Sequence, residues 1–118
     1  MKTIRPTLSL RWKSLRWQVP VAEILYADSY SRHVMVHTAA ETYEVVGKLS
    51  ELQAALDALP EAGGFLRTHQ SFLVNMRYIA RFLCDSVVLF DGTVIPLSAR
   101  KRAEALRRYD AWLSGSEQ

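Results

Sequence analysis

The stretch that decides the fold runs from residue 65 to residue 79 and reads Phe65-Leu66-Arg67-Thr68-His69-Gln70-Ser71-Phe72-Leu73-Val74-Asn75-Met76-Arg77-Tyr78-Ile79. Its first five residues form a short segment of mixed polarity. Ser71 follows at a position where a hydroxyl caps a helix, so we expect one helical turn directly after it. The stretch therefore predicts short elements, and short elements continue on both sides of it.

On the C-terminal side, the sequence predicts a hairpin followed by a helix. Segments 87–90 and 93–95 have the character of strands. Asp91-Gly92 between them favours a tight turn, because both residues tolerate positive φ. Ser98 then opens an amphipathic helix, whose apolar positions are Ala99, Ala103, Leu106 and Leu113.

On the N-terminal side, the sequence predicts a hairpin and further strands. Apolar and polar residues alternate on both sides of Lys13-Ser14, which is the period of half-buried strands joined by a turn. The polar face of this hairpin carries Arg11, Lys13 and Arg16. Three strands and one polar loop are expected next, the strands at 21–27, 33–38 and 42–46 and the loop at 28–32.

A helix is predicted over residues 48–59. Its leucines recur at helical spacing and form one apolar stripe, made of Leu49, Leu52, Leu56 and Leu59. Ser50, with Gln53 three residues later, predicts a capping box at the start of the helix. We expect this helix to have a packing role.

Composition places the chain among globular domains. It has 118 residues, of which 49% are apolar and 23% charged, so we expect a single domain over residues 1–118 that needs no metal or disulfide staple. Cys84 is the only cysteine, which excludes an internal disulfide and makes the cytoplasm the expected location. No apolar run is long enough to span a bilayer, so a membrane is not an expected partner.

Charge is unevenly distributed along the chain. Residues 1–37 hold six basic and two acidic residues, and residues 65–118 hold eight basic and five acidic ones. Residues 38–64 hold one lysine and five acids. Either the two basic ends share one face, or the clustering is a chance property of a solvated surface.

The sequence holds no convincing catalytic constellation. His33, His37, His69 and Cys84 do not fall at zinc-ligand spacings. Nucleophile-elbow, Walker and dinucleotide-binding motifs are absent. We therefore expect no enzyme activity, no metal, no cofactor and no small-molecule substrate.

The stretch 65–79 resembles the signature of the LytTR family of bacterial DNA-binding domains. Two further matches are co-linear with it, Ile24-Leu25-Tyr26 followed by Asp28, and Asp91-Gly92 followed by Ile95-Pro96-Leu97-Ser98. The resemblance covers about residues 8–113. It implies a mainly β fold with short helices, in which small antiparallel sheets stack side by side.

The resemblance also implies a function and its partners. Members of the family bind double-stranded DNA sequence-specifically, through loops that reach the major groove. Most are transcription regulators and form the output half of two-component response regulators. They bind tandem promoter repeats, so a second copy on adjacent DNA is an expected partner.

Carried onto this sequence, the resemblance assigns residues to the DNA interface. Arg32, with His33 beside it, matches a base-reading loop position, and Gln70 after the motif histidine His69 matches another. Arg100 matches a third position. Beyond the matched positions, we expect the basic residues Lys101, Arg102, Arg11 and Lys13 to be auxiliary phosphate contacts. Asn75 and Ser71 match structural motif positions, and His69 is either a DNA contact or structural. Arg67 either faces DNA or forms a structural ion pair.

The charges near Ser98 support this assignment independently. Arg100, Lys101 and Arg102 are predicted in the first helical turn, where the helix dipole disfavours cations and free N–H groups attract anions. A bound phosphate would offset that cost. The alternative is that these side chains simply extend into solvent.

Two departures from the family pattern keep a rival function open. Gln70 stands where an arginine is usual, and no receiver domain precedes the motif region, so the chain is either a stand-alone regulator or an output domain on its own. The rival is a protein-interaction module on the same β scaffold that no longer reads DNA. An RNA-binding module is a weaker third, because no stacked aromatic platform is evident.

Overall fold

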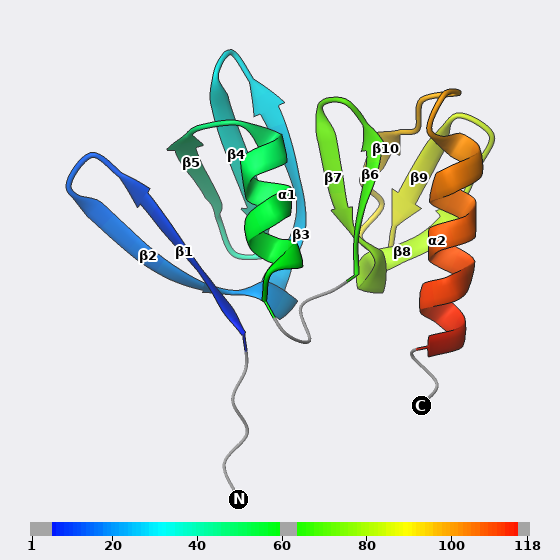
Figure 1. The fold of residues 1–118 in the computed structure, drawn as a ribbon, viewed down its shortest axis with the longest axis horizontal. Coiled ribbons are helices and arrows are strands. Elements are labelled where there is room, and N and C mark those ends of the chain that lie inside the picture. The colour runs from blue at the N-terminus through cyan, green and yellow to red at the C-terminus, as the bar shows by residue number, and fades with distance from the viewer. Residues whose placement is uncertain (1–5, 60–63, 116–118) are drawn as a thin grey trace, which may run out of the picture.

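The computed structural model describes residues 6–59 and 64–115, which form three antiparallel sheets and two α-helices (Figure 1). The first sheet is a hairpin of β1 (Thr7–Trp12) and β2 (Leu15–Pro20). The five-stranded central sheet has the order β5-β4-β3-β7-β6 and contains β3 (Ile24–Tyr30), β4 (His33–Thr38), β5 (Thr42–Val46), β6 (Phe65–His69) and β7 (Phe72–Asn75). The third sheet has the order β10-β9-β8 and contains β8 (Ile79–Phe82), β9 (Ser86–Leu89) and β10 (Val94–Pro96).

Helical segments connect and cover these sheets. The helix α1 (Leu49–Asp57) follows β5, and α2 (Arg102–Gly115) ends the described part of the chain. Two single 3₁₀ turns, η1 (Val21–Glu23) and η2 (Met76–Tyr78), lead into β3 and β8. The expected single domain over 1–118 includes residues 1–5, 60–63 and 116–118, which lie outside the described residues.

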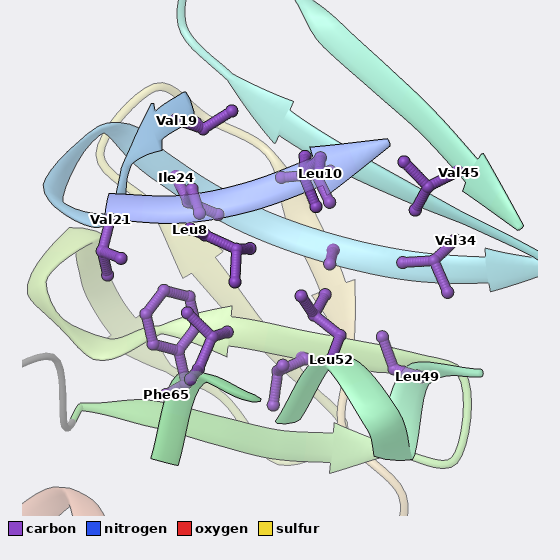
Figure 2. Close-up of a cluster of buried hydrophobic side chains, with 14 residues drawn as sticks. Leu8, Leu10, Val19, Val21, Ile24, Val34, Val45, Leu49, Leu52 and Phe65 are labelled. Atoms are coloured by element: carbon purple, nitrogen blue, oxygen red, sulfur yellow. The ribbon is translucent and has the colours of Figure 1, made fainter. Parts of the chain in front are cut away.

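The central sheet separates two hydrophobic cores. Figure 2 shows the first core, in which Leu10 of the hairpin, Val34 of the central sheet and Leu52 of α1 meet. The second core lies between the central sheet, the three-stranded sheet and α2, and its buried residues include Val74, Leu89, Ile95 and Ala105. The architecture is therefore a row of sheets packed side by side.

Pairs of consecutive apolar residues explain why the stretch 65–79 determines the side-by-side packing of the sheets. Successive residues of a strand point to opposite faces. In β6 and β7, Phe65 and Leu73 are buried in the first core, while Leu66 and Val74 are buried in the second. These two strands therefore need cover on both faces, and they join the two halves of the molecule.

Most of the predicted elements are confirmed. The mainly β fold with side-by-side antiparallel sheets is the observed one. The first hairpin turns at Lys13, and the strands predicted at 33–38 and 42–46 have the predicted bounds. The leucine stripe of α1 faces the first core, and the Asp91-Gly92 turn joins β9 to β10 with Gly92 at φ 94°.

The predicted caps were wrong. Ser71 does not open a helix, because it lies in the turn between β6 and β7. Asn75 caps the helical turn η2 instead, since its side chain accepts from the backbone N–H of Arg77. In α1 the cap forms two residues earlier than predicted and has one side-chain hydrogen bond, in which Glu51 accepts from the backbone N–H of Lys48 at 3.0 Å.

Two element boundaries and one helix face also differ from prediction. Residues 28–30 belong to β3 rather than to a loop, and residues 21–23 form η1 rather than a strand. The helix α2 begins at Arg102 and buries Ala105, with Tyr109 and Trp112 packed on the same core. The predicted stripe fails because Ala103 and Leu113 are exposed.

Candidate nucleic-acid interface

Three chain connections lie along one edge of the molecule, at the top of Figure 1: the β3–β4 turn, the β6–β7 turn and the connection from β10 to α2. Backbone hydrogen bonds join them. The Ser29 N–H donates to the Ser71 carbonyl at 3.0 Å, which ties the second connection to β3. The Ser98 N–H donates to the Thr68 carbonyl at 2.8 Å, which ties the third connection to β6. The edge is thus held by main-chain contacts.

The first connection is a two-residue turn in an unusual conformation. Ser31 and Arg32 have φ values of 49° and 70°, and their neighbours Tyr30 and His33 pair across the hairpin. Positive φ at both positions is typical of type I′ turns, which favour Asn-Gly. A non-glycine residue in this region costs about 1–2 kcal/mol. The fold therefore holds Arg32 in a costly backbone conformation with its side chain exposed.

His33 lies beside Arg32 but is engaged within the fold. Its Nδ1 lies 2.6 Å from the Glu44 carboxylate on β5. Its ring also meets the ring of Trp12 edge to face, with the centroids 5.2 Å apart. His33 therefore anchors β4 to its neighbours. Arg32 is exposed and forms no ion pair within residues 6–59 and 64–115.

The Arg67 side chain fixes the second connection, the β6–β7 turn, through hydrogen bonds. Its Nε donates to the His69 carbonyl at 3.1 Å, and its Nη2 donates to the Gln70 carbonyl at 2.7 Å. Its Nη1 donates to the Gln53 side chain on α1 at 2.9 Å. Burial lowers the pKa of the Arg67 guanidinium from its ordinary value. The sequence left its role open between DNA and an ion pair, and the structure shows a third role, a fork that fixes the turn.

The fixed turn presents Gln70 and His69. The Gln70 side chain is exposed, and its amide offers both a donor and an acceptor. The Ser71 N–H donates to His69 Nδ1 at 3.1 Å. A neutral His69 ring therefore carries its proton on Nε2, which makes that atom a hydrogen-bond donor.

The third connection places its cations just before the helix. Ser98 accepts from the Lys101 N–H through both its carbonyl and its hydroxyl, at 3.1 and 3.2 Å. The prediction that all three cations occupy the first helical turn was wrong, because only Arg102 is inside α2. Arg100 is exposed in the preceding turn, and Arg102 donates through Nε to the Cys84 carbonyl at 3.0 Å.

A pocket of about 210 Å³ lies between the second and third connections. Its lining includes three cationic side chains, those of Arg67, Lys101 and Arg108, and one carboxylate, that of Glu104. An excess of positive charge around a concave surface attracts anions such as phosphates. This pocket also includes Arg108, a residue of α2.

Asn75 has a different place from the exposed residues. It is buried, and its Nδ2 donates to the Ile24 carbonyl at 2.9 Å, while its Oδ1 accepts from the Arg77 N–H at 3.1 Å. Both ends of its amide are therefore used by the backbone, and it supports the edge from within the fold.

Other kinds of site are not evident in the described part of the chain. Residues 6–59 and 64–115 hold no group of three or more His, Cys, Asp or Glu side chains that could bind a metal ion. In the same ranges, no helix has the length and hydropathy needed to cross a membrane.

Comparisons with known proteins agree with this geometry. The family model described as the LytTr DNA-binding domain matches residues 15–109, so the chain belongs to the LytTR DNA-binding domain family. Its three-sheet architecture is similar to that of a solved LytTr DNA-binding domain from Bacillus cereus, with a TM-score of 0.69 and 22% identity, over 87% of this chain and 94% of that one.

A curated relative is the sensory transduction protein LytT of Bacillus subtilis (strain 168). It is 32% identical over 95 residues, which cover 76% of this chain. The match spans only 37% of the length of LytT. The chain therefore matches only about a third of the length of this relative.

Proposed function

We propose that this chain is a transcription regulator, or the DNA-binding part of one, that reads double-stranded DNA sequence-specifically. Arg32, Gln70 and Arg100 would enter the major groove and contact bases. Lys101 and Arg102 would bind the phosphates between these contacts, and His69 would add a donor beside Gln70.

One observation carries this proposal. Arg32, Gln70 and Arg100 are exposed side chains from three separate connections, which lie in that order along one edge (Figure 1). The longest dimension of the molecule is 43 Å, and successive major grooves on one side of a duplex are about 34 Å apart. The molecule as a whole is therefore longer than one helical repeat of DNA. Because members of the family reach successive major grooves with such loops, we expect the three connections to address two successive grooves from one face of the DNA.

The residue types suit base contacts. An arginine fork can donate to O6 and N7 of guanine together, and a glutamine amide can pair with N6 and N7 of adenine. A good bidentate pair contributes about 1–3 kcal/mol of discrimination against the wrong base. The short turns that hold these side chains limit the entropy lost when they bind.

The two ends of the edge differ from its centre in the base that they are expected to prefer. Arg32 and Arg100 favour guanine, and Gln70 in the middle favours adenine. A family member with arginine in place of Gln70 would gain a charge and favour guanine there. Gln70 should therefore give this protein a base preference of its own in the centre of its site.

The test is selection from a random-sequence duplex library, followed by sequencing, at two salt concentrations. Enrichment of a defined motif, with guanines separated by about one helical turn, supports a sequence-reading regulator. Enrichment of two such motifs in tandem supports a second copy on adjacent repeats. Salt-sensitive binding without any enriched sequence would contradict the proposal, because phosphate contacts alone carry no sequence information.

A further inference from the structure

The tip of the β1–β2 hairpin concentrates positive charge outside the three connections described above. Arg11 and Arg16 are direct partners across the hairpin, and Lys13 occupies its turn. All three side chains are exposed. Like charges directly opposite one another destabilise an antiparallel pair, so this arrangement has a cost in the isolated protein.

The charges at the tip are not neutralised by neighbours. In residues 6–59 and 64–115, none of the three cations forms an ion pair with a carboxylate. Arg16 donates through Nη1 to the Lys13 and Leu15 carbonyls, both at 2.9 Å, which orders the turn but leaves its charge uncompensated. Arg11 and Lys13 are therefore the charges available to a ligand.

The three cations surround a hollow. Together with Trp12 and Val46 they line an open pocket of about 330 Å³. Lys13 Nζ lies 5.7 Å from the centroid of the Trp12 ring, so the ring holds this ammonium group at the rim. The pocket combines concave shape with uncompensated positive charge, which favours an anion.

The pocket is continuous with the first base-reading turn. Trp12 contacts the ring of His33, the residue directly after Arg32. Val46 pairs with His33 in the sheet register, and the N–H of the following residue, Gly47, donates to the Arg32 carbonyl at 3.2 Å. In Figure 1 the hairpin projects at the left, beyond the β3–β4 turn and away from α2. It thus extends the edge at one end only.

We propose that the β1–β2 hairpin tip binds the phosphate backbone of the duplex beyond the base pairs read by Arg32. The footprint on DNA is then asymmetric, with an additional contact on the Arg32 side and none on the Arg100 side. This inference rests on the proposed function. Duplex DNA suits the site better than an acidic peptide does, because the pocket continues the edge that faces DNA and its apolar side chain Trp12 is already packed on His33.

The test uses duplexes that hold one high-affinity site and are lengthened on one flank at a time. The wild-type chain should gain affinity when one flank is extended and should gain nothing from the other. The Arg11→Gln/Lys13→Gln variant should lose that gain and keep the same base preference. Arg16 is left in place because it orders the turn.

The salt dependence gives a second readout. Each lost phosphate contact reduces the slope of log K against log salt by about 0.9. When the salt concentration is raised from 50 to 200 mM, the affinity of both proteins for the duplex falls. The factor by which it falls should be about ten times smaller for the double variant than for the wild type. Its thermal midpoint should not fall, since a repulsive pair has been removed.

A matched control removes the same charge elsewhere. Arg77→Gln/Arg81→Gln alters two exposed cations, on η2 and β8, which belong neither to the hairpin nor to the three connections. This control should keep the flank effect and the salt slope of the wild type. If the control variant lost the flank effect and the salt slope as much as the hairpin variant does, the proposal would be overturned, because the change in net charge alone would explain the result.

The remaining outcomes separate the two proposals. If the hairpin variant binds every duplex as the wild type does, the inference is wrong and the base-reading function stands. If the same variant loses binding only to a poly-glutamate probe, the tip is a site for acidic protein and the inference is also overturned. If the wild type binds no duplex at all, both the proposed function and the inference about the hairpin tip are wrong.

Discussion

Asn75 donates its Nδ2 to the carbonyl oxygen of Ile24 at 2.9 Å, across 51 residues of sequence. The same side chain accepts from the Arg77 N–H, so one buried amide joins the end of β7, the start of β3 and the turn η2. A carboxylate can accept but cannot donate, and a hydroxyl or an alanine cannot reach both partners. The position therefore requires an amide of this length.

Asn75→Ala should destabilise the fold by about 2–4 kcal/mol, because it removes the partners of the buried Ile24 carbonyl and of the partly buried Arg77 N–H. Urea unfolding measures this loss. Asn75→Asp keeps the acceptor for Arg77 and loses the donor to Ile24, so it should also destabilise the fold at neutral pH. A loss below about 0.5 kcal/mol for the alanine variant would show that water replaces the amide without cost.

The strained turn at Ser31 and Arg32 predicts a conflict between stability and function. Replacement of the pair by Asn-Gly supplies the residues that tolerate positive φ and should stabilise the fold by about 1 kcal/mol. The thermal midpoint should rise by about 4 °C, while affinity for the selected duplex should fall at least tenfold. A variant that retained full affinity would exclude Arg32 from the interface.

Arg67 should act as a positioning residue for the DNA contact. Arg67→Met removes three hydrogen bonds and should lower both stability and duplex affinity, yet leave the salt slope unchanged. Arg67→Lys keeps the charge but loses the fork, so it should be impaired to a similar degree. A salt slope reduced by about 0.9 in Arg67→Met would instead indicate a direct phosphate contact.

Asp91 should make the β9–β10 turn sensitive to acid. The Thr93 N–H donates to the Asp91 carboxylate at 2.9 Å, and this hydrogen bond lowers the pKa of Asp91 below its ordinary 3.8. A folded-state pKa below the unfolded one gives stability that is present above pH 3.8 and is lost as pH falls through the folded value. Urea midpoints of wild type and Asp91→Asn, compared from pH 6 to pH 2.5, should therefore converge at low pH. A constant difference over this range would contradict the assignment.

Local sequence pattern predicted the strands whose partners are close in the chain. Residues 33–38 and 42–46 alternate in polarity and pair with each other across a short turn, so the local pattern and the tertiary structure agree. Residues 28–30 read as a loop because they are polar. They are a strand because their backbone pairs with β4, Asp28 opposite Met35 and Tyr30 opposite His33, and this pairing is visible only in the sheet register.

The candidate site also combines features that the sequence predicts with features that only the fold shows. The positions of Arg32, Gln70 and Arg100 followed from resemblance to a family, and their exposure and alignment on one edge appear only in the fold. Arg67 could not be assigned from sequence, because one of its three partners, Gln53, lies 14 residues away on α1. The charge at the hairpin tip was visible in sequence, whereas the direct pairing of Arg11 with Arg16 required the register.

The most direct test of the central claim is to repeat the duplex selection with Arg32→Ala, Gln70→Ala and Arg100→Ala beside the wild type. Each variant should lose base preference at its own positions and keep it at the others. The positions lost by the two arginine variants should be about one helical turn apart, with those of Gln70→Ala between them. If all three variants bind more weakly but keep the wild-type preference at every position, these side chains do not read bases and the account is wrong.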